Sequence, residues 1–302
     1  MNNIIDCHSH YMPKEVAQNT AFFKVAWSDV DRQLSAMDSN GIDKALLLYP
    51  TSDAHLKMNG WKNVCKIYNA EIAKVAKENN DRFIGAGIIP GDNEKDIIEE
   101  LKSIHDLGFK VVSVASSYSG RYLDDEMYDC LFEYASKNDV CLHIHPQIIN
   151  PIGEERVKDP LLSPVLEYVF DVSMSLGKLM MSGVLLKYSD VKLIFAHYGG
   201  VLPFVAERFD NTYLMLRRRD FVKDLTKLPS QYFSNLYFDS SGCKSAGALA
   251  CMLEVVEADH ILFGSDYPAN QNIQRSIEVI MEAQISDDQR SSILKCTLFD
   301  TI

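Results

Sequence analysis

The strongest constraint on the fold is a succession of eight short apolar runs separated by helical patterns. The runs are apolar nearly throughout, as is typical of strands whose two faces are both buried. They cover residues 4–10, 44–50, 82–90, 110–117, 140–146, 191–197, 236–241 and 260–266. Amphipathic stretches lie between them, among them residues 27–41, 93–108, 124–138 and 272–284. Eight strands alternating with helices predict a parallel α/β fold, the (β/α)8 TIM barrel.

An open, doubly wound sheet is the alternative architecture, but no glycine-rich phosphate turn follows the first apolar run. The 302 residues, 47% of them hydrophobic, suffice for one large barrel core. We therefore expect a single domain over residues 1–302, closed by a C-terminal helix at about 286–299.

Charge and cysteine content exclude several classes of protein. The net charge of −12 disfavours a nucleic-acid surface, and the basic run at residues 217–219 is too short to change that. No stretch approaches about 18 uninterrupted apolar residues, so no membrane span is expected. The seven cysteines are scattered without a C-x-x-C pair, and the first residues do not resemble a secretory signal. A reduced, cytoplasmic protein is predicted.

Histidine and aspartate side chains gather where the predicted strands end. His8 and His10 close the first run, His145 the fifth, His197 the sixth and Asp266 the eighth. In a (β/α)8 barrel these ends form the active site. Several such residues, each at the top of a different strand, are hard to explain by stability alone, and they predict a metal site.

Alternation along the strands indicates which histidines face one another. Residues i and i+2 share a face, so we expect His8 and His10 to point into the barrel mouth and Cys7 to point away. His143 shares a face with His145 but lies about 6.6 Å deeper, which is two steps of the strand rise. His145 is therefore the expected ligand. His143 either hydrogen-bonds a ligand or belongs to the core.

Three imidazoles and one carboxylate, with positions left for water, suit zinc or a similar divalent ion. The fourth run offers no Lys or Glu to bridge a second ion, so we expect one metal. Asp239, at the end of the seventh run, is either a helix N-cap or a hydrogen-bond partner of a ligand. Structural roles are expected for the histidines in loop, mid-helix and strand-start positions, which are His55, His105 and His260.

Motifs spread over nearly the whole chain resemble the amidohydrolase-related family of metal-dependent enzymes, in particular its aminocarboxymuconate-semialdehyde decarboxylase-like branch. They are DCHSHYMPKE, AMDSNGIDKALL, RFIGAGIIP, LGFKVVSVASS, HIHP, SGVLLKYSDVKLIFAHYGGVLPFVAERFD and ILFGSDYP. The resemblance implies that His8, His10, His145 and Asp266 bind the metal. It implies that His197 is the catalytic histidine. Beside this, a carboxylate such as Asp266 can both bind the metal and shuttle a proton.

Arg208 matches an arginine that, in the decarboxylases of this branch, reaches a substrate carboxylate across a homodimer interface. An ordinary surface ion pair is the alternative for this side chain. The first loop of the chain lacks the second substrate-binding arginine of that branch, so the aminocarboxymuconate substrate itself is not carried over.

The resemblance favours non-oxidative decarboxylation of a small aromatic or unsaturated carboxylic acid, with one Zn²⁺ or Mn²⁺. The same residues also support hydrolysis of a lactone, ester or amide by a metal-activated water, or hydration of a diene or keto acid. A metal-binding scaffold without activity has no use for His197, which is not needed as a ligand.

Overall fold

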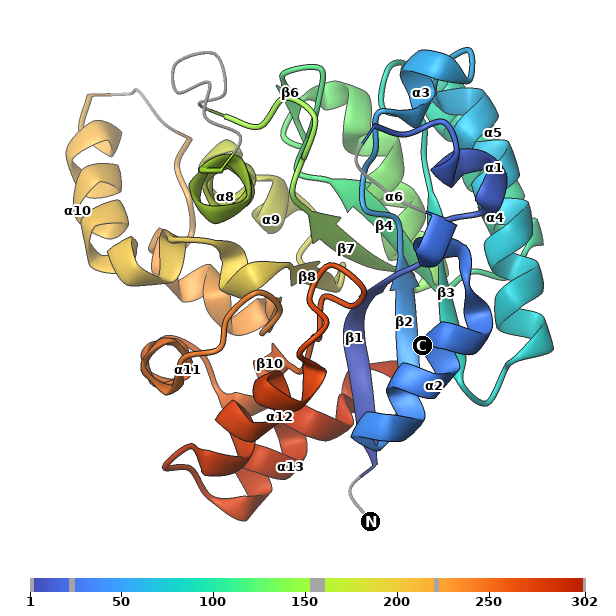
Figure 1. The fold of residues 1–302 in the computed structure, drawn as a ribbon. Coiled ribbons are helices and arrows are strands. Elements are labelled where there is room, and N and C mark those ends of the chain that lie inside the picture. The colour runs from blue at the N-terminus through green and yellow to red at the C-terminus, as the bar shows by residue number, and fades with distance from the viewer. Residues whose placement is uncertain (1–2, 22–24, 153–160, 220–222, 301–302) are drawn as a thin grey trace.

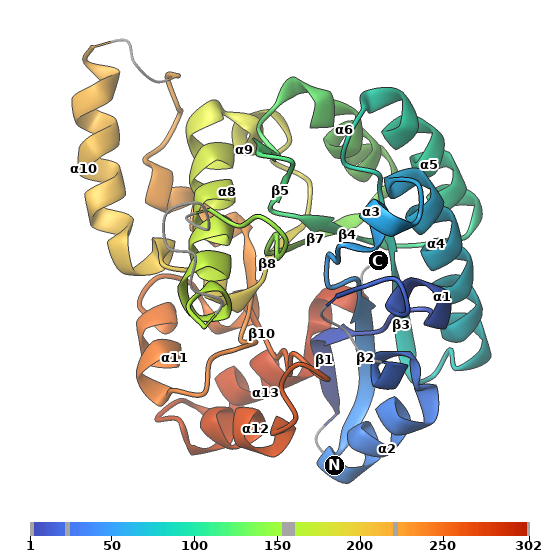
Figure 2. The ribbon, with the colours of Figure 1, turned by 45° about the horizontal axis from the view of Figure 1, so that its top comes forward.

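The computed structural model describes residues 3–21, 25–152, 161–219 and 223–300, and it confirms the (β/α)8 barrel (Figures 1 and 2). Eight strands form one sheet in the order β1-β2-β3-β4-β7-β8-β9-β10, and every pair is parallel. The strands are β1 (Ile4–His10), β2 (Ile42–Leu48), β3 (Phe83–Ile88), β4 (Val111–Ala115), β7 (Cys141–His145), β8 (Leu193–Phe195), β9 (Tyr237–Asp239) and β10 (Ile261–Leu262).

The first and last strands close the ring through backbone hydrogen bonds. The Cys7 amide donates to the Phe263 carbonyl at 2.8 Å, and the Asp266 amide donates to the His8 carbonyl at 2.8 Å. The His10 amide donates to the Tyr267 carbonyl at 2.7 Å. All three bonds involve residues beyond β10, so the segment that carries Asp266 is held directly against the histidines of β1.

Helices surround the strands, and their ends follow local capping chemistry. The side chains of Asp29 and Asn93 accept backbone amides at the starts of α2 and α5, and Gly41 ends α2 in the left-handed conformation. The helices are α1 (Lys14–Ala17), α2 (Val30–Asn40), α3 (Ala54–Lys57), α4 (Trp61–Glu78), α5 (Glu94–Asp106), α6 (Asp129–Asn138), α8 (Tyr168–Ser182), α9 (Val184–Lys187), α10 (Ala206–Arg217), α11 (Ala246–Leu253), α12 (Ile273–Glu282) and α13 (Asp287–Lys295).

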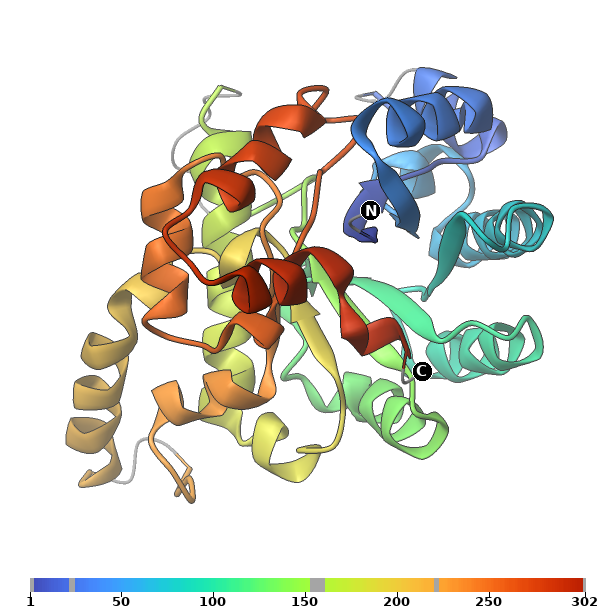
Figure 3. The same ribbon diagram turned by 90° about the horizontal axis from the view of Figure 1, so that it is seen from below.

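The helix expected at about 286–299 is α13, followed by a 3₁₀ turn at Thr297–Asp300. It begins at a capping box between Ser286 and Gln289, and it ends at Cys296, whose φ of 44° is left-handed. Seen from below, this last part of the chain crosses the underside of the barrel (Figure 3). It therefore covers the end opposite to the mouth.

Two apolar clusters hold the barrel together. The larger packs the outer faces of the strands against the helices, and the smaller joins residues of seven strands to Cys296 and Leu298. Cys7 belongs to the smaller cluster, so the expectation that it faces away from the histidines is wrong. The cause is a bulge: between Asp6 and Ser9 of β1, two residues oppose one residue of β2.

Short segments build the rim above the strand ends. They include the hairpin β5 (Ser117–Tyr118) and β6 (Arg121–Tyr122), the π-helical turn η3 (Ser163–Glu167), and the 3₁₀ turns η1 (Val25–Ser28), η4 (His197–Gly199) and η5 (Leu202–Val205). Helix α10 stands to one side of the barrel (Figures 1 and 2). Within the described ranges, none of the helices has the length and apolar character of a membrane span.

Candidate metal centre and active site

The structure brings the four expected ligands together at the mouth of the barrel. Nε2 of His8 lies 3.1 Å from Nε2 of His10, and nitrogens of both rings lie within 4.8 Å of one on His145. Asp266 Oδ1 lies 3.1 Å from His10 Nε2 and 3.7 Å from His8 Nε2. All three histidines are buried. The arrangement is compact enough for one ion to contact all four side chains.

Each of the three rings is oriented by a hydrogen bond at its Nδ1 atom. His8 Nδ1 lies 2.9 Å from Asp239 Oδ2, His10 Nδ1 lies 3.3 Å from the Leu48 carbonyl, and His145 Nδ1 lies 3.0 Å from the Pro146 carbonyl. Carbonyl and carboxylate oxygens only accept, so each Nδ1 carries the proton. The lone pair of each Nε2 is then available to a metal.

Burial and neighbouring groups set the charge states of His8, His145 and Asp266. Burial lowers the pKa of His8 to about 4, against the attraction of Asp239, and it lowers the pKa of His145 well below its ordinary value. Burial alone raises the pKa of Asp266, but the hydrogen bond with His10 and the nearby histidines outweigh it and lower this pKa. Neutral imidazoles and an ionised carboxylate are the forms that bind a divalent ion, so the residues fit a metal.

The backbone next to the ligands has little room and unusual conformations. A Cβ atom on Gly264 would lie 2.8 Å from Cβ of His8 and 3.3 Å from Cβ of Asp239, so only glycine fits between them. Asp266 has a φ of 62°, and His197 has a φ of 54°. Left-handed backbone is costly for residues with a side chain, and here it occurs at two residues of the candidate site.

Asp239 is a buried hydrogen-bond hub below the ligands. Its Oδ2 accepts from His8 at 2.9 Å and from His143 Nε2 at 3.0 Å, and its Oδ1 accepts the amides of Ser241 at 3.0 Å and His197 at 3.2 Å. His8, His143 and Asp239 are also close enough to hold an ion of their own. Because the carboxylate is already at hydrogen-bond distance from both rings, we interpret this group as a support for His8.

His197 belongs to the same site but is fixed by different contacts. Its Nδ1 lies 3.1 Å from the Ser241 carbonyl and 2.8 Å from the Ser241 hydroxyl. Its ring centroid lies 5.4 Å from that of His8. A Cβ atom on Gly242 would approach His197 Nδ1 to 3.1 Å, so the turn after β9 packs closely against this ring. His197 therefore stands beside the ligands and lines the cavity above them.

A cavity of about 630 Å³ opens over this cluster, and His10, His145, His197 and Asp266 form part of its wall. The remaining wall is mainly apolar and comes from the rim segments, including Trp27, Ile148, Tyr168, Val169, Tyr198 and Phe204. The Trp27 ring stacks on His10, with centroids 5.7 Å apart and an interplanar angle of 18°. The cavity thus has a polar, metal-binding end and a flat aromatic wall.

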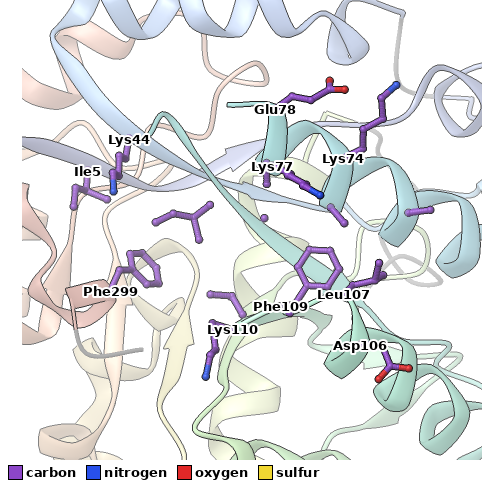
Figure 4. Close-up of a pocket in the computed structure, with 17 residues that line it drawn as sticks. Ile5, Lys44, Lys74, Lys77, Glu78, Asp106, Leu107, Phe109, Lys110 and Phe299 are labelled. Atoms are coloured by element: carbon purple, nitrogen blue, oxygen red, sulfur yellow. The ribbon is translucent and has the colours of Figure 1, made fainter. Parts of the chain in front are cut away.

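A larger cavity of about 1100 Å³ lies toward the opposite end of the strands, between α4, β3 and the C-terminal turn (Figure 4). Lys44, Lys77 and Lys110 surround it together with Phe109 and Phe299. No histidine lines it. We place the chemistry in the smaller cavity, because three histidines and Asp266 converge there among the described lining residues.

Comparison with known proteins identifies the family of the chain. The sequence model described as "Amidohydrolase" matches residues 5–295.

The chain belongs to the amidohydrolase family.

Curated relatives of this amidohydrolase include a 2-amino-3-carboxymuconate-6-semialdehyde decarboxylase of Dictyostelium discoideum. It is 26% identical over 208 residues, which are 68% of this chain and 56% of that protein. A gamma-resorcylate decarboxylase of Polaromonas sp. JS666 is also 26% identical, over 97% of this chain and 96% of that protein.

Solved structures share the fold over the whole length. The 5-carboxyvanillate decarboxylase of Sphingomonas paucimobilis superposes with a TM-score of 0.90 at 20% identity and covers 100% of both chains. The dihydroxybenzoic acid decarboxylase of Polaromonas sp. JS666, solved with manganese and 2-nitroresorcinol, has a TM-score of 0.85 at 23% identity. It matches 99% of this chain and 96% of its own.

Arg208 is the predicted site residue that the structure does not bring to the cluster. It lies exposed on α10 and is not among the residues that line the cavity. It forms no ion pair with a carboxylate of the described residues, so the surface ion pair considered above is not seen. Among the residues that the structure describes, no ion pair connects this guanidinium to the candidate metal centre of its own chain.

Several residues of the site were not identified from the sequence. Ser241 contacts both His8 and His197, and Trp27 forms the aromatic wall. Serine at a strand end carries no signal of its own, since the type is common in turns. Trp27 lies in the first loop region and reaches the cavity only because η1 folds over the mouth.

Proposed function

We propose that this chain is a metal-dependent, non-oxidative decarboxylase of a small aromatic carboxylic acid. The observation that carries the proposal is the cavity, in which a cluster of three histidines and one aspartate faces apolar and aromatic walls. The carboxylate of a substrate suits the end with the histidines and the aspartate, and its aromatic ring suits the apolar walls. The relatives described above, which are named as decarboxylases of gamma-resorcylate and 5-carboxyvanillate, support the same assignment.

We propose His8, His10, His145 and Asp266 as the ligands of one divalent ion. Imidazole and carboxylate donors suit zinc, and manganese is the second candidate because the related dihydroxybenzoic acid decarboxylase was solved with it. When bound, such an ion supplies a positive charge that holds and polarises the carboxylated end of the substrate. The ring of Trp27, which stacks on His10 and lines the cavity, offers an apolar surface to the substrate ring.

His197 and Asp266 are the proposed proton carriers. Because Nδ1 of His197 donates to the Ser241 carbonyl, its Nε2 is the nitrogen that exchanges a proton with the substrate. The reaction needs one proton at the ring carbon that bears the carboxylate. As the carbon–carbon bond breaks, CO₂ leaves, and the electron pair of that bond stays on the ring carbon as the new C–H bond. Both residues line the cavity, so either is placed to deliver this proton after it has first taken one up from solvent.

The proposed assembly is a homodimer in which Arg208 binds the substrate carboxylate of the partner chain. Exposed apolar side chains on and beside α10, including Phe204, Val205 and Met215, support an interface there. A guanidinium can hold a carboxylate with two parallel hydrogen bonds. We also propose a cytoplasmic location, because all seven cysteines are free thiols.

A substrate panel tests the reaction class. The metal-loaded protein is incubated with hydroxybenzoic and muconic acids, and in parallel with aryl esters, lactones and amides. We expect CO₂ and a ring product lighter by one CO₂ from at least one aromatic acid. Hydrolysis of an ester, lactone or amide without CO₂ from any acid would replace this proposal by the hydrolase alternative.

A further inference from the structure

Asp171 of α8 is a buried carboxylate that lies outside the cavity and yet connects three segments of the rim. Only 1% of its surface is exposed. The Tyr122 hydroxyl donates to its Oδ1 at 2.7 Å, and the Ile152 amide donates to the same atom at 3.2 Å. The hydroxyls of Ser116 and Ser117 donate to its Oδ2. A buried charge is tolerated where several donors surround it, as they do here.

One of these partners leads directly to a proposed metal ligand. The Ser116 amide donates to the His145 carbonyl at 2.7 Å, and the Gln147 amide donates to the Ser116 hydroxyl oxygen at 2.8 Å. Ser116 is therefore hydrogen-bonded to the backbone on both sides of Pro146. The hydrogen bond from His145 Nδ1 to the Pro146 carbonyl then fixes the imidazole relative to that backbone. The path from Asp171 to the ring runs through the Ser116 hydroxyl, the backbone of residues 145–147 and the hydrogen bond at His145 Nδ1.

The helix that carries Asp171 also forms part of the cavity wall. Tyr168 and Val169 of the same helix line the cavity and lie three and two residues before Asp171. The carboxylate thus ties α8 to the end of β7. Movement of this helix would change both the width of the cavity and the position of His145.

We propose that Asp171 is a positioning residue that holds His145 in place for the metal and sets the distance between the metal centre and the wall formed by α8. This inference rests on the metal site proposed above. Asp171 and Ser116 themselves contact neither the proposed metal-binding atoms nor the cavity.

The test compares metal affinity with fold stability in matched variants of the full chain. The dissociation constants for Zn²⁺ and Mn²⁺ are measured by competition with a chelator at a temperature where every variant is folded, and Tm is measured without metal. For Asp171→Asn and Ser116→Ala we expect a dissociation constant raised about 10- to 100-fold, the usual effect of removing support behind a metal-binding histidine. The dissociation constant of the double variant should be little higher than that of the single variant with the weaker metal binding, because both residues act on one path.

Two control variants separate positioning from general stability. Tyr122→Phe removes one donor from Asp171 but leaves the path through Ser116 intact, so it should lower Tm without changing metal affinity. Glu167→Gln alters a neighbouring buried carboxylate whose described partner, Ser163, lies on its own turn, and metal affinity should again stay the same.

Three outcomes would count against the proposal. Metal binding by Asp171→Asn and Ser116→Ala as tight as that of the unaltered chain would overturn the positioning role alone. Equal losses of affinity in the Tyr122→Phe control would show a general effect of stability and would also overturn it. If the unaltered chain bound neither ion, the proposed metal site and the positioning role would both fail. A chain that binds metal but releases no CO₂ contradicts only the proposed reaction.

Discussion

Asp239 Oδ2 lies 2.9 Å from Nδ1 of His8, and this contact decides which nitrogen of His8 faces the other ligands. With its proton on Nδ1, the ring directs the lone pair of Nε2 toward His10 Nε2, 3.1 Å away. Burial alone raises the pKa of Asp239, but His8 and His143 outweigh it and hold this pKa well below its ordinary value. The carboxylate therefore stays ionised while it orients the ligand.

Replacing this carboxylate should weaken the metal site. In Asp239→Asn the side chain keeps its shape but offers one acceptor oxygen where the aspartate offers two. We expect metal affinity to fall about 10- to 100-fold, as measured by chelator competition. An Asn variant with unchanged affinity would mean that the contact with His8 does not set the ligand geometry.

Replacing His197 should reduce catalytic activity without reducing metal content. Its Nδ1 is held by Ser241, and it is not one of the proposed ligands. His197→Ala should keep about one ion per chain and lose activity by about 10²-fold or more, the scale of a lost general acid or base. Elemental analysis alongside the assay decides the point, since loss of the ion in this variant would make His197 a ligand.

Acid should destabilise the metal-free protein, and Asp6 should partly oppose that effect. Burial lowers the pKa of His8 to about 4, so below its ordinary value of 6.5 the unfolded chain takes up a proton that the folded chain does not. The free energy of unfolding therefore falls as the pH drops from 6.5 toward 4. Burial raises the pKa of Asp6 to about 7 from its ordinary value of 3.8. Between pH 7 and 3.8 the folded chain therefore binds a proton at Asp6 that the unfolded chain does not. This contribution to the free energy of unfolding grows as the pH drops.

Asp6→Asn removes the opposing contribution. Denaturant titrations of the metal-free protein at pH 7, 6 and 5 should show a steeper loss of stability in the variant than in the unaltered chain. The slope is the informative quantity, because it does not depend on how much the substitution itself destabilises the fold. Equal slopes would mean that Asp6 is already ionised in the folded protein.

Substitutions of Arg208 test the proposed homodimer with a shared site. If Arg208 reaches the site of the partner chain, Arg208→Ala should raise KM strongly with little change in Tm, because this side chain is exposed and has no ion pair with the described residues. Arg208→Lys should restore binding only in part, since the planar pair of donors is lost. Light scattering that shows an active monomer at assay concentration would rule out the shared site.

Much of the fold could be predicted because its signals are local. The eight apolar runs correspond to the eight strands, since buried parallel strands need side chains that are apolar on both faces. His8, His10, His145 and Asp266 could be placed together because the C-terminal ends of barrel strands converge. Their roles as ligands remain a proposal.

Other features depend on contacts that no local pattern encodes. The orientation of Cys7 was predicted wrongly because one bulge in β1 interrupts the alternation of faces. Asp171 and Ser241 act through hydrogen bonds to residues far away in the chain, such as Ser116 and His8. A serine or aspartate in these positions looks like an ordinary turn or helix residue until the fold is known.

The most direct test of the account is CO₂ release by the same protein before and after removal of its metal. With an aromatic acid identified from the panel, the native protein should release one CO₂ per ring product. Stripping the ion with a chelator should abolish release, and adding Zn²⁺ or Mn²⁺ should restore it, except in the His8→Ala and Asp266→Ala variants, which should not retain the ion. Undiminished CO₂ release by the fully stripped protein would contradict a metal-dependent decarboxylase.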